Sequence, residues 1–311
     1  MMKAVKPKKS THPVNPVTQM VMRSLRWLQV KRPFVSATNA QRYLRHYASR
    51  AKQPLPIPKL KSQRRLSEEF GFPVVTLSPK NKIPSGVVVL FHGGAYVRPP
   101  LADHWHFADH LVSRTQWQVI VPIYPKAPQS TVSETIEKVM PLLKHTLINH
   151  SHVVVVGDSA GGGLALALCE ILAHEGYPLP QHLVLLSPWL DIALRNPQTQ
   201  ALEAVDPILG VDGLREIGRI WSGDLRDTDP KVSPLFGLEP TLPPMTLITG
   251  TQEIFFPDIL AMAKQAETLG LSVDLEIGEG LFHCYPLFAV PEAAPVFEGL
   301  VQRLTTIENR R

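Results

Sequence analysis

A serine lies in the glycine-framed sequence Gly157-Asp158-Ser159-Ala160-Gly161, which matches the pattern G-x-S-x-G. The apolar run Val153–Val156 precedes it, and a segment rich in Leu and Ala follows it. Glycines on either side permit a sharp turn from strand to helix, and the helix then directs N–H groups at negative charge near the hydroxyl. A phosphate-binding loop is disfavoured, because no Lys completes a P-loop and the G-x-G-x-x-G spacing is absent. The pattern predicts that Ser159 is a nucleophile.

A second glycine motif, His92-Gly93-Gly94, follows the apolar run Val87–Phe91 and precedes the serine motif in the chain. Attack of a serine on a carbonyl group creates an oxyanion, which the N–H groups of adjacent glycines can stabilise without steric cost. We therefore predict an oxyanion hole formed by the N–H groups of Gly93, Gly94 and Ala160. His92 is expected to brace the loop and to transfer no proton.

A general base and an acid are needed to complete the site, and hydrolases with this serine motif have the chain order Ser, acid, His. His283 is the last histidine and follows the apolar run Val273–Ile277, so we predict that it is the general base. The acid is expected after the preceding apolar run, Met245–Thr249. Glu253 is favoured over the alternative, Asp258, which falls in the first turn of the next predicted helix, where acids commonly cap.

Other histidines and the two cysteines suggest no further chemistry. His104, His106 and His110 share one predicted helix, but no Glu accompanies them as in H-E-x-x-H, and no further ligand cluster is evident. We predict no metal and no cofactor. Cys169 and Cys284 are too few for a disulfide framework and fit a reducing compartment. Cys284, beside the predicted base, is interpreted as a small apolar filler.

The charge of the chain is unevenly distributed. Residues 1–65 contain 16 of the 32 Lys and Arg and no Asp or Glu, which leaves 16 basic and 27 acidic residues, a net charge of −11, in the remainder. Such an arm is compatible with membrane contact, but apolar residues at helical spacing favour a surface layer that packs on the acidic body. The predicted apolar face consists of Val17, Met20, Val21, Leu25 and Leu28. No nucleic-acid partner is expected.

The location and the oligomeric state follow less directly from the sequence. No apolar run is long enough to span a bilayer, and no apolar core of a signal peptide follows the basic start Met1–Pro13. We therefore expect a cytoplasmic protein. A homodimer and a monomer both stay open.

From about residue 73, short apolar runs alternate with segments of helical length, which predicts a mainly parallel, doubly wound α/β sheet. The stretch 192–232 interrupts this rhythm and is too long for an ordinary connection, so we interpret it as an insertion over one end of the sheet. Strands are predicted at 74–77, 87–91, 119–123, 153–156, 183–186, 245–249 and 273–277, and helices at 103–116, 132–148, 160–174, 257–269 and 293–306.

Several motifs in this order resemble those of the hormone-sensitive-lipase-like family of α/β-hydrolases. In addition to the two glycine motifs, they are Tyr124-Pro125-Lys126-Ala127-Pro128, Ser187-Pro188-Trp189-Leu190-Asp191, Asp206-Pro207-Ile208-Leu209, Ser233-Pro234-Leu235 and His283-Cys284-Tyr285-Pro286. Many members have Asp where Glu253 stands here. The resemblance implies an α/β-hydrolase fold with an eight-stranded, mostly parallel sheet and a helical cap. It also implies hydrolysis of short- to medium-chain carboxylic esters without a cofactor.

The resemblance also implies a division of the chain and a reaction. Residues 1–70 form an N-terminal cap segment and linker, and residues 71–311 form the catalytic domain with its cap insertion at about 192–232. A small-molecule ester is the expected substrate of a Ser-His-Glu triad. A membrane-associated lipase, an amidase and a non-catalytic small-molecule-binding homologue are the alternatives. The last is disfavoured because Ser159 and His283 are both present.

Overall fold

A single sheet of nine strands runs through the computed structural model, which describes residues 7–9, 13–50 and 53–309. The strand order is β1-β9-β8-β7-β6-β4-β5-β3-β2, and all neighbours are parallel except the pairs β2–β3 and β3–β5. The strands are β1 (Lys8–Lys9), β2 (Gln63–Ser67), β3 (Val74–Ser78), β4 (Val87–Phe91), β5 (Gln118–Pro122), β6 (Val153–Asp158), β7 (His182–Leu186), β8 (Met245–Gln252) and β9 (Val273–Phe282). The expected α/β-hydrolase class is confirmed.

The two edges of the sheet differ from the prediction. The resemblance implies eight strands, whereas the described residues form nine, because the two-residue strand β1 pairs with β9. Strand β2, with the sequence QRRLS, has no apolar run, because it lies on an edge with mostly exposed side chains. The central strands β4, β6 and β7 are buried along their whole length, which is why the sequence predicted them well.

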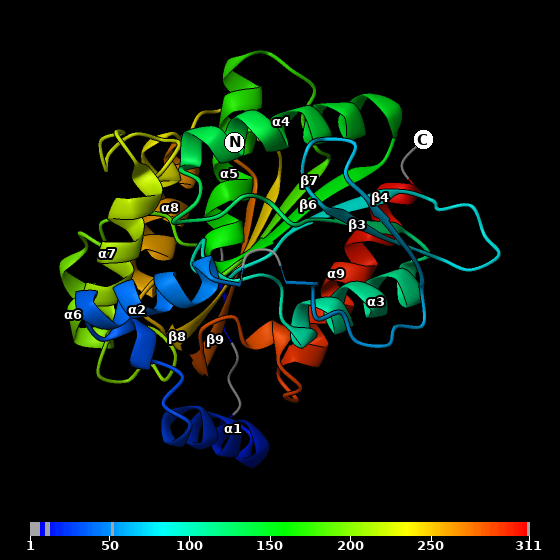
Figure 1. The fold of residues 1–311 in the computed structure, drawn as a ribbon. Helices are drawn as coiled ribbons and strands as arrows, with labels where there is room; N and C mark the ends of the chain where they lie inside the picture. The colour runs from blue at the N-terminus through cyan, green and yellow to red at the C-terminus, as the bar shows by residue number, and fades with distance from the viewer. Residues whose placement is uncertain (1–6, 10–12, 51–52, 310–311) are drawn as a thin grey trace.

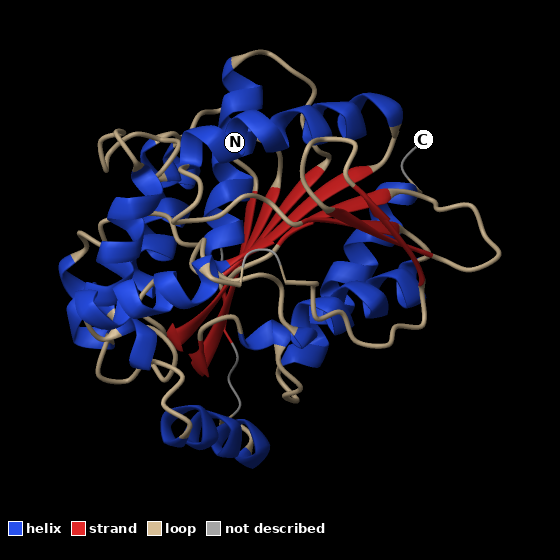
Figure 2. Cartoon of the chain, viewed as in Figure 1, coloured by secondary structure: helices blue, strands red, loops and turns tan. Residues whose placement is uncertain are grey.

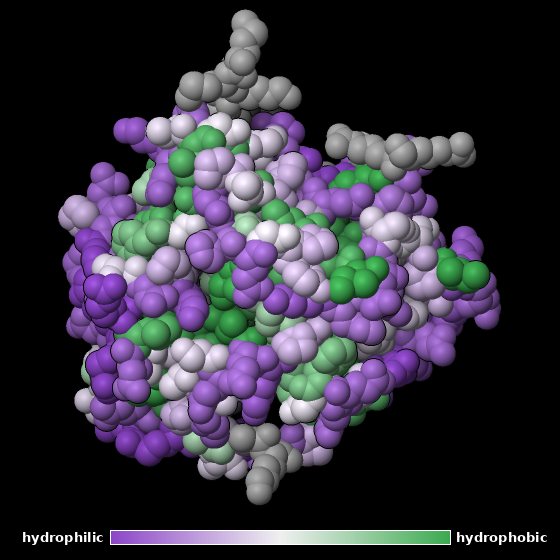
Figure 3. Space-filling view, turned by 90° about the horizontal axis from the view of Figure 1, so that it is seen from above, coloured by the Kyte–Doolittle hydropathy of each residue, from purple (hydrophilic) through white to green (hydrophobic). Residues whose placement is uncertain are grey.

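Five helices cover the two faces of the sheet. Figures 1 and 2 show α3 and α9 together on one face, with α4, α5 and α8 on the other. Each lies within two residues of its predicted bounds. They are α3 (Ala102–Thr115), α4 (Val132–Asn149), α5 (Ser159–His174), α8 (Phe256–Thr268) and α9 (Ala293–Glu308). The face of the molecule seen in Figure 3 is largely hydrophilic, with hydrophobic residues gathered in a hollow near its centre.

Two distant segments of the chain pack together beyond the carboxyl end of the sheet. The N-terminal one contains α1 (Pro16–Trp27), η1 (Arg32–Phe34) and α2 (Ala37–Ala48), and the other contains α6 (Pro197–Leu202) and α7 (Val211–Ser222). Helix α2 lies against α7 (Figure 1). Close packing requires glycine here, because a Cβ at Gly213 would come within 2.5 Å of the backbone of Phe34. The predicted insertion at 192–232 therefore contributes helices to the layer that the N-terminal segment forms.

Helix α1 forms as predicted, but its buried side differs from the predicted apolar face. Thr18 and Met22 are buried, whereas Val17, Met20 and Leu28 are 45%, 60% and 62% exposed. Val21 and Leu25, two other predicted members, are half-buried. The orientation of the helix is set by polar contacts at its start, where Asn15 and Thr18 donate to the carboxylate of Glu292.

The basic arm contacts acids of the body mainly through hydrogen bonds, as the N–H groups of Lys61 and Ser62 do at Asp109. Among its described residues, one forms an ion pair, Arg65 with the nearby Glu69. Residues 1–6 and 10–12 of the basic start lie outside the described part of the chain. Elsewhere in the arm, Arg26 donates to the carbonyl of Val205, and Lys8 lies beside Glu276 on the neighbouring strand.

Candidate active site

The serine motif forms a sharp turn between β6 and α5. Ser159 has a φ of +53°, in the left-handed region that costs energy for a residue with a side chain. The two glycines of the motif are required by close packing. A Cβ at Gly161 would lie 2.1 Å from the carbonyl oxygen of Phe91, and one at Gly157 would lie 2.5 Å from that of Gly161. The turn therefore holds the Ser159 hydroxyl at the carboxyl end of the sheet.

The three predicted catalytic residues meet at this turn. His283, directly after β9, places Nε2 2.9 Å from Oγ of Ser159 and Nδ1 2.6 Å from Oε2 of Glu253, which follows β8. The Nδ1–H donates to the carboxylate, which leaves Nε2 to accept the hydrogen bond of the serine hydroxyl. All three side chains are buried, and the edge of the imidazole ring contacts the Phe255 ring. This is the geometry of a nucleophile, a base and an orienting acid.

Three donors hold the other carboxylate oxygen of Glu253, which is fully buried. Oε1 accepts hydrogen bonds from the hydroxyl of Ser187 at 2.8 Å, from the hydroxyl of Thr249, and from the N–H of Gly250 at 3.0 Å. The Ser187 oxygen in turn accepts from the N–H of Cys284, 3.0 Å away. A buried carboxylate needs such donors, because it has lost its water. They also fix the orientation in which it meets His283.

The alternative acid, Asp258, lies elsewhere in the first turn of α8. Its carboxyl group faces Asn196, and its Oδ2 atom has no hydrogen-bond partner among the described residues. Burial raises the pKa of this carboxyl group to about 6. The structure thus brings Glu253, and not Asp258, to His283.

The glycine loop corrects one predicted role. The N–H of Gly93 donates to Oδ1 of Asp158 at 2.8 Å, so it is engaged within the protein and does not face a developing oxyanion. A Cβ at this glycine would lie 2.2 Å from the same carboxylate. The Asp158 Oδ2 atom lies 3.3 Å from Nε2 of the buried His104. Asp158 therefore ties the serine turn to the loop and to α3, a contact that no local sequence pattern reveals.

The other predicted donors remain at the turn. Gly94 and Ala95 have φ values of +127° and +56°, so the loop reverses sharply here. Ala160 lies in the first turn of α5, where N–H groups have no carbonyl partner within the helix. The carbonyl groups of Phe91 and His92, at the start of the loop, pack closely on Gly161 of the serine turn.

His92 braces the loop, as predicted. Its Nδ1–H donates to the carbonyl of Gly93 at 2.7 Å, and its ring stacks on Tyr124 with centroids 4.5 Å apart. The Tyr124 hydroxyl donates to the carbonyl of His92. Burial holds the pKa of this imidazole well below its ordinary value, because the charged form of the ring would lose its water.

The insertion contacts the acid loop through Asp206. Its Oδ2 atom accepts from the N–H of Ile254, the residue after Glu253, at 3.0 Å, while Oδ1 accepts from the N–H groups of Ile208 and Leu209. Burial raises the pKa of Asp206 to about 6, although nearby His283 and these N–H groups act in the opposite direction. The motif Asp206-Pro207-Ile208-Leu209 does not by itself reveal this contact with the acid loop.

A row of buried aromatic rings leads from α7 to the predicted base. Trp221 stacks on Tyr96 with centroids 4.2 Å apart, and Tyr96 stacks on Trp189 at 5.6 Å. Trp189 stacks on Phe255, which contacts His283. Bulky, apolar side chains from the loop, the insertion and the body therefore wall one side of the site.

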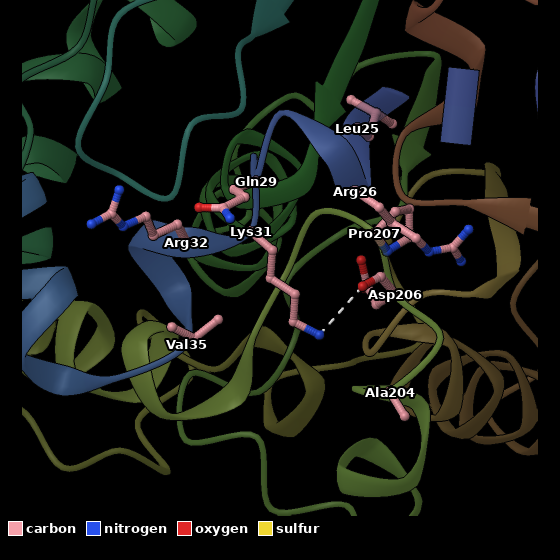
Figure 4. Close-up of a pocket in the computed structure, with 9 residues that line it drawn as sticks. All are labelled: Leu25, Arg26, Gln29, Lys31, Arg32, Val35, Ala204, Asp206 and Pro207. Carbon is pink, nitrogen blue, oxygen red and sulfur yellow. Dashed lines mark hydrogen bonds between the residues drawn. The ribbon is translucent and has the colours of Figure 1, made fainter. Parts of the chain in front are cut away.

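A groove of about 370 Å³ lies between the N-terminal segment and residues 204–207 of the insertion (Figure 4). Lys31 reaches across it and donates to the carbonyl oxygens of Glu203 and Asp206. One of its lining residues, Asp206, also contacts the acid loop through the N–H of Ile254. It is lined by Leu25, Arg26, Gln29, Lys31, Arg32, Val35, Ala204, Asp206 and Pro207.

Two further features concern metals and membranes. Within residues 7–9, 13–50 and 53–309, no three His, Cys, Asp or Glu side chains cluster as metal ligands would. Of the three histidines on α3, His104 faces Asp158 and His110 stacks on Phe297. None of the described helices is both long and apolar enough to cross a bilayer.

Comparison with known proteins decides the family. The alpha/beta hydrolase fold family matches residues 88–287, which is 200 of the 311 residues. The chain belongs to this α/β-hydrolase family. An esterase of Acinetobacter venetianus is 30% identical over 223 residues, covering 70% of this chain and 74% of that relative. A triacylglycerol lipase of Mycobacterium tuberculosis is 37% identical over 185 residues, which cover 58% of this chain but only 37% of the lipase.

Solved structures of other α/β-hydrolases have the same fold. An esterase from the bacterial hormone-sensitive lipase family superposes with a TM-score of 0.79 at 24% identity and covers 96% of this chain and 100% of its own. A hormone-sensitive lipase from a metagenome library also gives 0.79, at 21% identity, with 95% and 99% covered. The resemblance that the motifs indicated is confirmed.

Proposed function

We propose that this α/β-hydrolase cleaves carboxylic esters through an acyl-enzyme formed on Ser159. His283 takes the proton of the serine hydroxyl as the oxygen attacks the ester carbonyl, and Glu253 stabilises the imidazolium that results. The same histidine then activates the water that releases the acid. The observation that carries this proposal is the continuous hydrogen-bonded relay from Ser159 Oγ through His283 to Glu253, with distances of 2.9 and 2.6 Å.

The proposed oxyanion hole differs from the one predicted by the sequence. Because the N–H of Gly93 is held by Asp158, we assign the hole to the N–H groups of Gly94 and Ala160, with that of Ala95 as the third donor. Ala95 follows Gly94 in the same reversal of the loop. Fixed donors of this kind stabilise the tetrahedral intermediate without reorganising during the reaction.

Relatives named esterase, lipase and acetyl-hydrolase agree that the chain is a carboxylic ester hydrolase. Within that class we propose small esters with short to medium acyl chains, because the row of aromatic rings from Trp221 to Phe255 restricts one side of the site. We also propose a cap formed by the helical part of residues 1–70, from α1 to α2, together with residues about 192–232, whereas β1 and β2 of residues 1–70 belong to the sheet of the catalytic domain. The contact of α2 with α7 supports this division.

The proposal is tested with a series of chromogenic esters of increasing acyl length and with one anilide matched to the preferred ester. We expect hydrolysis of the short and medium esters, much slower cleavage of the anilide, and loss of both in Ser159→Ala, whose circular dichroism should match the wild type. Faster cleavage of the anilide would favour an amidase. Preference for triacylglycerol emulsions over dissolved short esters would favour a lipase, and activity retained in Ser159→Ala would refute the assigned nucleophile.

A further inference from the structure

Helix α1 presents an apolar stripe to solvent. Val17, Met20, Trp27 and Leu28 are 45%, 60%, 82% and 62% exposed, and their spacing places them on one side of the helix. Figure 1 shows α1 at the lower edge of the molecule, set apart from the sheet. A cluster of large apolar side chains on a projecting helix has an unfavourable free energy of hydration, because these side chains are not buried in the core.

The orientation of this stripe is fixed by polar contacts and is not the result of a loosely attached helix. The N–H of Asn15 and the hydroxyl of Thr18 both donate to the carboxylate of Glu292, at the start of α9. Near the other end of α1, the Arg26 guanidinium donates to the carbonyl of Val205 at 2.9 Å. Together with the burial of Met22, these contacts turn Trp27 and Leu28 outward.

The surroundings of the stripe are basic. Arg23, also exposed, lies beside it on α1, and Arg32 follows in η1. Residues 1–65 contain 16 Lys and Arg and no acid. The described members of this arm make a single ion pair, Arg65 with Glu69, which lies outside α1 and η1. Cations without acidic partners around exposed Trp, Leu and Met side chains match the composition of a helix that lies in a membrane interface.

We propose that α1 docks this protein on an anionic lipid surface, with the stripe Val17, Met20, Trp27 and Leu28 inserted among the acyl chains and Arg23 and Arg32 at the headgroups. The charge of the arm selects this occupant, because a zwitterionic surface or an apolar protein face would leave the cations without counter-charges. Leu25 and Arg26, which line the groove of Figure 4, lie on the side of the same helix that faces the body, so docking through the stripe leaves these contacts in place. The proposal concerns binding and does not rest on the proposed reaction.

Trp27 provides a direct probe, since the other four tryptophans, Trp105, Trp117, Trp189 and Trp221, are fully buried. The full-length protein is mixed with phosphatidylcholine vesicles that contain or lack about 30% phosphatidylglycerol. We expect flotation and a blue shift of tryptophan emission with the anionic vesicles alone, and weaker binding as salt rises from about 0.1 to about 0.5 M. Trp27→Phe should keep the flotation and lose most of the blue shift.

The double variant Trp27→Ser/Leu28→Ser should bind anionic vesicles about tenfold more weakly or worse, since two apolar side chains are lost from the inserted face. The matched control, Ile83→Ser, removes a side chain that is 92% exposed outside the stripe and should bind as the wild type does. Equal binding of the double variant and the wild type, or equal binding to both vesicle types, would overturn the proposal. A third outcome would also overturn it: the wild type binds neither vesicle type and forms a dimer, and the double variant is a monomer. The stripe would then join two copies of the chain.

Discussion

The proposed catalytic centre and helix α1 use polar contacts in opposite ways. Around Glu253 and Asp158, every carboxylate oxygen has a partner within the protein, and these partners lie on different strands and loops. On α1, two donors to Glu292 hold the helix, while the apolar side chains of its outer stripe stay in solvent. Satisfying buried polar groups produces a rigid site in the first region. In the second, a few polar anchors expose a surface that only an additional partner can cover.

Replacing Glu253 should have the largest effect on activity, and therefore separates the proposed catalytic centre from α1 most clearly. In Glu253→Gln the amide cannot stabilise the imidazolium and can select the wrong tautomer, so we expect kcat to fall by about 10³- to 10⁴-fold. Asp258→Asn serves as the control and should change kcat little, because Asp258 faces Asn196. Kinetics of both variants on one soluble ester provide the measurement. A larger loss in Asp258→Asn would reassign the acid.

A smaller loss is expected when a donor to Glu253 is removed. Ser187→Ala deletes one of the three hydrogen bonds to Oε1 and should lower kcat about tenfold, since one such bond is worth about 1.4 kcal/mol, with little change in KM. Ser222→Ala is a matched control, because Ser222 is also buried but bonds to the carbonyl of Gly218 in α7. If both variants lose stability equally and keep full kcat, Ser187 has no positioning role.

The raised pKa of Asp258 predicts a dependence of stability on pH. The carboxyl group of Asp258 has a pKa of about 6 in the folded state and an ordinary value of 3.8. At a pH between these two values, the folded protein keeps the proton on this group, whereas the unfolded chain has released it. The contribution of this group to stability is therefore present at low pH and is lost as pH rises through about 6.

Asp258→Asn should remove this effect. At pH 8 it is expected to raise the free energy of unfolding by up to about 3 kcal/mol, and the gain should shrink below pH 6. Urea unfolding of the variant and the wild type at pH 8, 6 and 5 makes the comparison. A gain that is constant across this range would exclude a buried charge as its cause.

The smallest effect is expected on α1. Trp27→Ser should leave kcat and KM for a dissolved short-chain ester within about twofold of wild type and should change the melting temperature little, since exposed side chains far from special contacts contribute little to stability. Assays and thermal unfolding without lipid test this. A large loss of activity or a large drop in melting temperature would mean that Trp27 packs on the body. The contrast between the two regions would then be weaker.

The parts of the site that sequence predicted best lie at the ends of buried strands. Ser159, Glu253 and His283 follow β6, β8 and β9, and the carboxyl ends of neighbouring parallel strands meet at one edge of a sheet. Local patterns are sufficient there, because apolar runs define the strands and glycines mark the turns. The five helices that cover the sheet were predicted in the same way, from the segments of helical length between these apolar runs.

The remaining features depend on contacts between distant residues. The N–H of Gly93 is taken by Asp158, 65 residues later, and Ser187 meets Glu253 across two strands. Neither pairing produces a periodic pattern in the sequence. Ser187 gives a weaker indication, because a polar residue at the end of a buried strand needs a hydrogen-bond partner. The rotation of α1 is likewise set by Glu292, 274 residues from Thr18. Helical spacing alone predicted the helix, but Val17, Met20 and Leu28 of the predicted apolar face are exposed.

The central claim is that Ser159 becomes covalently acylated with His283 as its base. Incubation of the wild type with a fluorophosphonate, followed by peptide mass spectrometry, tests it most directly. We predict one adduct, on the peptide that contains Gly157 to Gly161, and labelling that is abolished in Ser159→Ala and strongly slowed in His283→Ala. A stable adduct on any other residue of the wild type, or undiminished labelling of Ser159→Ala, would contradict the account.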